Sequence, residues 1–154
     1  MPSIQTAYQG KRVLVTGHTG FKGSWLTQWL LSMGAEVAGY ALDPQAHEIL
    51  YDKLSISDRL AVDYRADLSD RSALNKLVAD FSPDIIFHLA AQPLVRLSYE
   101  IPVETFTTNI IGTVHLLDAV RRTGNACCVV CVTTDKCYDN REWLLAYRLK
   151  AYKY

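Results

Sequence analysis

The sequence has little that would direct it to nucleic acid or to a membrane. Its 154 residues hold 16 Lys and Arg against 16 Asp and Glu, so the formal net charge is zero, and no basic run stands out. The opening residues, MPSIQTAYQGK, lack the apolar stretch of a signal peptide, and no segment reaches the length that spans a bilayer. We therefore expect one cytoplasmic domain with a sizeable core that binds neither nucleic acid nor a membrane.

The spacing of the cysteines does not suit a metal site. The four cysteines, Cys127, Cys128, Cys131 and Cys137, form no paired C-x-x-C knuckles. Three of them lie in the apolar run 126–132, where cysteine behaves as a small hydrophobic residue. We predict that these three are buried in a strand. A metal site is the alternative, which the missing ligand spacing disfavours.

The usual dinucleotide fingerprint, G-x-G-x-x-G, is missing too, and a related spacing takes its place. Gly17, Gly20 and Gly23 follow the apolar run 13–15 as G-x2-G-x2-G, and apolar residues recur at helical spacing from Phe21 onward. Such a strand, turn and helix bind phosphate because glycines let backbone N–H groups approach the anion at the helix N-terminus. The alternative is a tight turn without a ligand.

Strands and helices alternate along the rest of the chain. We predict strands at 13–16, 36–42, 61–65, 85–91 and 127–132, and helices at 21–33, from a Ser69 cap through 73–81, and at 103–123. The order predicts an α/β fold, a doubly wound parallel sheet of Rossmann type with right-handed crossovers. Ligands of such sheets bind over the carboxyl ends of the strands.

Two acidic residues follow predicted strands. Asp43 lies about 20 residues beyond Gly23, where a dinucleotide-binding fold places the carboxylate that accepts hydrogen bonds from the adenosine ribose and favours NAD over NADP. The alternative is a solvated residue at a turn. Asp67 either reaches the adenine amino group or starts a helix.

Small and polar residues follow the fourth and fifth strands. Ala90 and Ala91 would let a flat cofactor lie close, whereas we interpret His88 as a structural core residue. Asn109 interrupts the apolar stripe of the long helix, and a buried amide needs partners, so it either ties two strand ends together or contacts the cofactor. The stripe comprises Phe106, Ile110, Thr113, Leu116, Leu117 and Val120. By composition, the residues 133–136 form an ordinary polar loop.

Four stretches carry a family resemblance: VTGHTGFKGSWLTQWL, HLAAQPLVRLSY, TNIIGTVHLLDAVR and VTTDKCYDNREW. Over about residues 10–143 the chain resembles the CDP-glucose 4,6-dehydratases, within the extended short-chain dehydrogenase/reductase superfamily. GHTGFKG and TTDKCYDN are specific, whereas LAAQ and TNIIGT are shared with sugar-nucleotide epimerases and other dehydratases. The predicted NAD-binding residues are Gly17, Thr19, Gly20, Phe21, Lys22, Gly23, Asp43, Asp67, Leu68, Leu89, Ala90, Ala91, Gln92, Asn109 and Thr133.

The resemblance implies that CDP-glucose is oxidised at C4 with tightly held NAD, loses water across C5 and C6, and regains the hydride at C6. It assigns Thr134 to the C4 oxygen, Asp135 to protonation of the departing C6 hydroxyl, and Lys136 to removal of the C5 proton. An acid on the leaving group and a base on the acidic carbon suit this elimination. The resemblance also implies a homo-oligomer. A 4-epimerase or a GDP-mannose dehydratase of the same superfamily is the rival enzyme.

The chain departs from this family at a Tyr-x3-Lys pair, which the 154 residues lack: Tyr138 has Glu142 at that offset and Tyr147 has Ala151. We expect residues 1–143 to form an incomplete NAD-binding domain, truncated after the fifth strand. A divergent tail, 144–154, would follow, with the C-terminal substrate domain absent. We therefore expect an inactive fragment; a non-catalytic NAD-binding piece is the alternative function.

Overall fold

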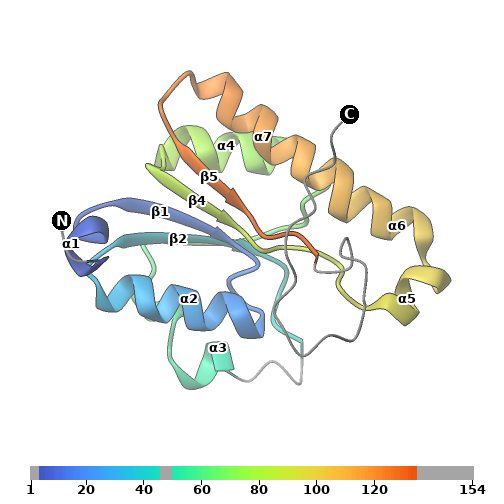
Figure 1. Cartoon of the computed structure of the whole chain (residues 1–154), viewed down its shortest axis with the longest axis horizontal. Coiled ribbons are helices and arrows are strands. Elements are labelled where there is room, and N and C mark those ends of the chain that lie inside the picture. The colour runs from blue at the N-terminus through green and yellow to red at the C-terminus, as the bar shows by residue number, and fades with distance from the viewer. Residues whose placement is uncertain (1–3, 46–49, 135–154) are drawn as a thin grey trace, which may run out of the picture.

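The computed structural model describes residues 4–45 and 50–134, which form a parallel sheet between two layers of helices (Figure 1). Its strands are β1 (Arg12–Thr16), β2 (Glu36–Ala41), β3 (Val62–Arg65), β4 (Ile85–His88) and β5 (Cys128–Cys131). They lie in the order β3-β2-β1-β4-β5, and every pairing is parallel. The winding therefore changes direction between β1 and β4, which confirms the predicted doubly wound α/β fold.

The helices divide between the two faces of the sheet. Along the chain they are α1 (Ile4–Tyr8), α2 (Phe21–Ser32), α3 (Leu50–Lys53), the 3-10 turn η1 (Ser57–Arg59), α4 (Arg71–Phe81), α5 (Val95–Glu100), α6 (Pro102–Phe106), the π-helical η2 (Thr107–Ile111) and α7 (Gly112–Thr123). Figure 1 shows α4 and α7 over one face and α2 with α3 over the other. In the described ranges no helix is both long and apolar enough to cross a bilayer.

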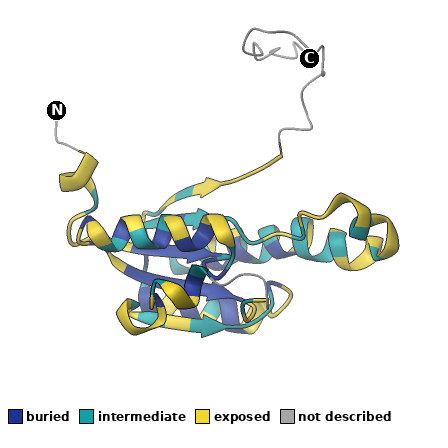
Figure 2. Ribbon diagram, turned by 90° about the horizontal axis from the view of Figure 1, so that it is seen from below, coloured by how far each residue is buried: buried dark blue, intermediate teal, exposed yellow. Residues whose placement is uncertain are grey.

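The central strand explains why the predicted strands read as continuous apolar runs. Leu14 packs against α4 and α7, with Leu74 and Leu116, whereas Val13 and Val15 pack against α2. The side chains of these three apolar residues are fully buried, and burial of each contributes about 1.5–3 kcal/mol of transfer free energy. Figure 2 shows the buried residues concentrated in this central part of the sheet.

The ends of the helices agree with the sequence at α2 and differ at α4. Gly34 follows α2 with a φ of 77°, a left-handed conformation that glycine adopts without a steric cost. The predicted cap of α4, Ser69, is wrong, because the carboxylate of Asp70 caps the helix by accepting from the Ala73 N–H at 2.9 Å. The serine instead donates its N–H to Asp67 Oδ1 at 2.7 Å.

The long helix also differs from its predicted form. It spans α6, η2 and α7, and a π-helical turn changes the direction of its side chains midway. Leu116 is fully buried, as the stripe predicts, but Phe106 and Ile110 are 63% and 50% exposed. The buried face of α7 instead comprises Gly112, Leu116 and Ala119.

The cysteines of β5 are not buried as predicted. Cys128 and Cys131 are exposed and Cys127 is half-buried, because β5 is the edge of the described sheet and helices α4 and α7 cover one of its faces (Figure 1). Cys137 lies outside the described residues, as do Asp135, Lys136, the expected domain end at 143 and the tail 144–154.

Candidate functional site

The glycine bend, residues 17–23, joins β1 to α2 through backbone contacts that leave no room for a side chain at Gly17 or Gly23. Gly17 has a φ of 74° and donates its N–H to the Tyr40 carbonyl at 2.8 Å. A Cβ on Gly17 would lie 2.8 Å from the Ala90 nitrogen, and one on Gly23 would overlap the carbonyl oxygen of Gly17. Both positions therefore require glycine.

The first turn of α2 has two features that suit an anion. Its cap residue, Gly20, offers no side-chain hydrogen bond to the helix N–H groups, and the turn holds no acidic residue. Lys22 and Phe21 lie in this turn and are exposed. A cation at a helix N-terminus is unfavourable with the helix dipole unless an anion binds nearby, so the composition of this turn suits a phosphate.

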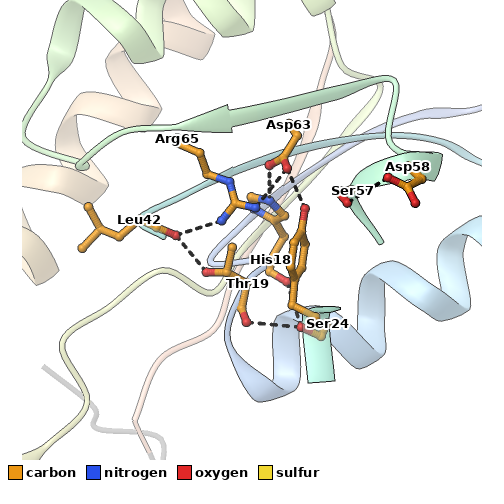
Figure 3. A network of polar contacts seen from close by, with 9 residues as sticks. His18, Thr19, Ser24, Leu42, Ser57, Asp58, Asp63 and Arg65 are labelled. Atoms are coloured by element: carbon orange, nitrogen blue, oxygen red, sulfur yellow. Dashed lines mark hydrogen bonds and ion pairs between the residues drawn. The ribbon is translucent and has the colours of Figure 1, made fainter. Parts of the chain in front are cut away.

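A polar network that the sequence did not reveal lies behind the bend (Figure 3). His18 is fully buried, and its Nε2 lies 2.8 Å from Asp63 Oδ1. The other carboxylate oxygen of Asp63 accepts from the Tyr51 hydroxyl at 2.6 Å and from Arg65 at 2.9 Å. Gly39 pairs with Asp63 across β2 and β3, and its missing side chain leaves space for the imidazole.

The charges of this network are set by burial and by hydrogen bonds. Burial lowers the pKa of His18, against the hydrogen bond to Asp63, which raises it. Burial also acts to raise the pKa of Asp63, but the hydrogen bonds from Tyr51, Arg65 and His18 outweigh it and hold this pKa below its usual range. A neutral His18 therefore donates to an ionised Asp63 at neutral pH.

The end of β2 is fastened to the same bend. Thr19 donates its hydroxyl to the Leu42 carbonyl at 3.1 Å, and Arg65 donates to that oxygen at 3.3 Å (Figure 3). Asp43 follows directly and is exposed. Its backbone therefore follows the residue that the glycine bend holds, and the ribose role of its carboxylate stays a prediction.

Asp67 and Leu68, after β3, serve the local backbone. Asp67 accepts from the Ser69 N–H, as its alternative role at the start of a helix requires, and its carbonyl accepts from the Tyr40 hydroxyl at 2.6 Å. Leu68 is 4% exposed, and its carbonyl lies 3.0 Å from His115 Nδ1. These contacts hold residues 67–68 at the carboxyl edge of the sheet. They also use several of the polar groups of this segment in hydrogen bonds within the protein.

The segment after β4, residues 89–92, lies against the glycine bend. The side-chain oxygen of Asn109 accepts from the Gln92 N–H at 2.8 Å, and the side-chain nitrogen of Asn109 donates to the Gln92 carbonyl at 3.1 Å. The amide therefore ties the loop after β4 to the π-helical turn. Leu89, Ala90 and Ala91 lie between these contacts and the end of β4, with Ala90 next to Gly17.

His88 is a buried structural residue, as the sequence interpretation had it, with two threonine partners. Its Nδ1 lies 2.7 Å from Thr16 Oγ1 and its Nε2 lies 2.9 Å from Thr113 Oγ1. Burial lowers the pKa of His88, so it is neutral at neutral pH. No sequence signal pointed to Thr16 or Thr113, because each becomes a partner only through the folding of distant elements.

Of the predicted catalytic group, only its first residue lies in the described part of the chain. Thr133 and Thr134 follow β5 and are exposed at the same carboxyl edge. Asp135 and Lys136 lie outside the described residues. Among residues 4–45 and 50–134 no three His, Cys, Asp or Glu side chains group closely enough to hold a metal.

Comparison with known proteins gives a consistent family. The family model described as GDP-mannose 4,6 dehydratase matches residues 14–142. The chain is 56% identical over 141 residues to CDP-glucose 4,6-dehydratase of Salmonella typhimurium, which covers 92% of this chain and 39% of that protein. It is 33% identical over 119 residues to GDP-mannose 4,6-dehydratase of Vibrio cholerae, covering 74% of this chain and 32% of that one.

Solved structures share the fold. UDP-glucose 4-epimerase of Stenotrophomonas maltophila, with bound NAD and formylated UDP-arabinopyranose, has a TM-score of 0.75 at 27% identity over 88% of this chain and 40% of its own. The Thermus thermophilus UDP-glucose 4-epimerase in complex with NAD has a TM-score of 0.61 at 34% identity, over 73% and 34%. The chain thus spans 40% or less of the length of each relative described.

Proposed function

The chain belongs to the GDP-mannose 4,6-dehydratase family of sugar-nucleotide enzymes, and we propose that it is the NAD-binding part of a CDP-glucose 4,6-dehydratase. The observation that carries this proposal is the glycine bend. Its backbone packs too closely for side chains at Gly17 and Gly23, and it opens into an uncapped helix N-terminus. The 56% identity to the Salmonella enzyme supports CDP-glucose over GDP-mannose, because the Vibrio cholerae GDP-mannose 4,6-dehydratase shares only 33%.

The residues fit a dinucleotide in four groups along the carboxyl edge. The bend from Gly17 to Gly23 would hold the pyrophosphate through backbone N–H groups. The carboxylate of Asp43 would accept from the ribose hydroxyls and repel a 2′-phosphate. Asp67 and Leu68 would lie along the adenine, and the small side chains of residues 89–91 would lie beside the rest of the cofactor. When bound, NAD supplies the hydride acceptor for the sugar.

The residues after β5 are proposed to act on the sugar. Thr134 would hydrogen-bond the C4 oxygen, Asp135 would protonate the departing C6 hydroxyl, and Lys136 would help to remove the C5 proton. The 154 residues contain no Tyr-x3-Lys pair to accept the proton of the C4 hydroxyl. We therefore expect this chain to bind NAD without dehydratase turnover. Incubation with CDP-glucose and NAD tests this, and formation of a 4-keto-6-deoxy product would contradict it.

Cofactor binding itself is tested by calorimetric titration of the 154-residue chain with NAD and with NADP. We expect saturable binding of NAD and weaker binding of NADP. Because Asp43 is exposed and lies outside the hydrogen-bonded network of the bend, Asp43→Ala should weaken NAD binding about tenfold without lowering the melting temperature. Asp58→Ala removes an equal charge from η1 and is the matched control. Absence of NAD binding by a cooperatively melting wild-type chain would refute the proposal.

The homo-oligomer that the resemblance implies stays a prediction. The surface that we expect to take part in the oligomer is an exposed apolar face along α6, η2 and α7. Its members are Val103, Phe106, Ile110 and Val114, which are all at least half exposed.

A further inference from the structure

A closed ring of hydrogen bonds surrounds residues 89–92. At its start, the N–H groups of Leu89 and Ala90 each lie 3.2 Å from Thr16 Oγ1. At its end, Asn109 binds both the N–H and the carbonyl of Gln92. His88, between Thr16 and Thr113, joins these two ends, because Thr113 Oγ1 also donates to the Asn109 carbonyl at 2.8 Å.

The hydrogen bonds of Thr113, on α7, determine where the protons of this ring lie. A threonine hydroxyl has one proton to donate. Thr113 gives that proton to the carbonyl of Asn109, so its oxygen must accept from His88 Nε2. The imidazole therefore carries its proton on Nε2, and Nδ1 is an acceptor.

The same answer follows independently from the strand side. Thr16 Oγ1 accepts from the Ala90 N–H and from the Leu89 N–H, which it shares with the Thr16 carbonyl at 3.2 Å. Its own proton needs an acceptor, and His88 Nδ1 lies 2.7 Å away. Both ends of the ring thus require a neutral His88 with the proton on Nε2. A protonated imidazole would force Thr16 to accept a third hydrogen and would leave the hydroxyl proton without His88 as its acceptor.

We propose that His88, as the neutral Nε2–H tautomer, is a positioning residue that directs this ring and so holds residues 89–92 against the glycine bend. The inference rests on the proposed function, because these residues are proposed to lie beside NAD. The Ala90 backbone lies so close to Gly17 that a Cβ on Gly17 would be 2.8 Å from the Ala90 nitrogen. A small displacement of residues 89–92 would therefore change their contact with the glycine bend. The π-helical turn is part of the same ring of hydrogen bonds. It contributes Asn109, whose carbonyl accepts from the Thr113 hydroxyl and whose side chain binds Gln92.

The tautomer is read directly by long-range ¹H–¹⁵N correlation NMR on the wild-type chain without cofactor. We expect neutral His88 with its proton on Nε2 at pH 7. A proton on Nδ1, or a doubly protonated ring, would overturn the inference. This outcome does not depend on NAD, so failure of the inference and failure of the proposed function are distinguishable.

The consequence for binding is tested with Thr113→Val, which leaves the Nε2 proton without its acceptor while keeping the shape of the side chain. We expect the Kd for NAD to rise about tenfold, because NAD binding would then have to restore the position of residues 89–92. Thr113→Ser retains the hydroxyl and should restore wild-type binding and the His88 signal. Thr27→Val is the matched control, because the buried Thr27 hydroxyl has no hydrogen-bond partner among the described residues.

The variants separate positioning from simple loss of stability. A positioning role requires that Thr113→Val shift the His88 ¹⁵N signals and weaken NAD binding while Thr113→Ser changes neither. Unchanged NAD affinity in Thr113→Val would refute the role. So would equal weakening in Thr113→Ser or Thr27→Val, because those variants keep the ring intact.

Discussion

Replacement of Gly39 by alanine is a direct test of the network behind the glycine bend. The new Cβ would lie 2.5 Å from His18 Cγ and Nε2. Ordinary van der Waals contact between such atoms needs about 3.5–4.0 Å, so the ring would have to move by about 1 Å. His18 has no room for this movement, because it is fully buried and its Nε2 is held by Asp63 at 2.8 Å.

Two opposing contributions determine how Gly39→Ala changes the unfolding free energy: the clash with His18 and the preference of a strand for alanine over glycine. Overpacking a tight interior costs about 1–3 kcal/mol. A change from glycine to alanine inside a strand by itself stabilises by about 0.5–1 kcal/mol. At the middle of these ranges, we expect Gly39→Ala to lower the unfolding free energy by about 1 kcal/mol, which for a chain of this length lowers the melting temperature by about 2–4 °C.

The assay is a double-mutant cycle with His18→Ala, followed by urea unfolding and thermal melts. With the imidazole removed, the clash disappears and only the strand preference remains. Gly39→Ala should then stabilise the His18→Ala chain by about 0.5–1 kcal/mol. Reversal of the sign between the two backgrounds is the expected result. Destabilisation of equal size in both backgrounds would show that His18 does not occupy the space above Gly39.

Two further predictions concern pH and the cap of α4. Burial lowers the pKa of His18 and of His88 below the ordinary value of about 6.5, so the unfolded chain binds more protons than the folded one below that pH, and stability must fall on acidification. Asp63, whose pKa is also lowered, extends the loss to lower pH. Thermal melts should show a melting temperature that is level between pH 7 and 8 and that decreases from about pH 6.5 to 5; an unchanged value at pH 5.5 would contradict this. Separately, Asp70→Ala should cost about 1 kcal/mol of stability in urea unfolding because the Ala73 N–H loses its partner, whereas Ser69→Ala should change stability by less than half as much. If Ser69→Ala lost more unfolding free energy than Asp70→Ala, the serine would be the cap of α4.

Sequence alone determined the features that depend on local backbone chemistry. The run Val13–Val15, the three glycines after it and the helical spacing from Phe21 predicted the strand, bend and helix because each follows from allowed dihedral angles and from apolar periodicity. The predicted helix 21–33 agrees with α2, which Gly34 follows in a left-handed conformation. The alternation of these elements was enough to predict a doubly wound parallel sheet.

Only the tertiary structure decided which polar groups meet. His18 and Asp63 are 45 residues apart in the chain and become partners because β3 lies beside β2. His88 obtains its threonines from β1 and α7, and this choice of partners fixes its tautomer. The exposure of Cys128 and Cys131 follows from the position of β5 at the sheet edge. Periodicity reports the faces of one element, whereas hydrogen-bond partners and the exposure of a strand depend on its neighbours in space.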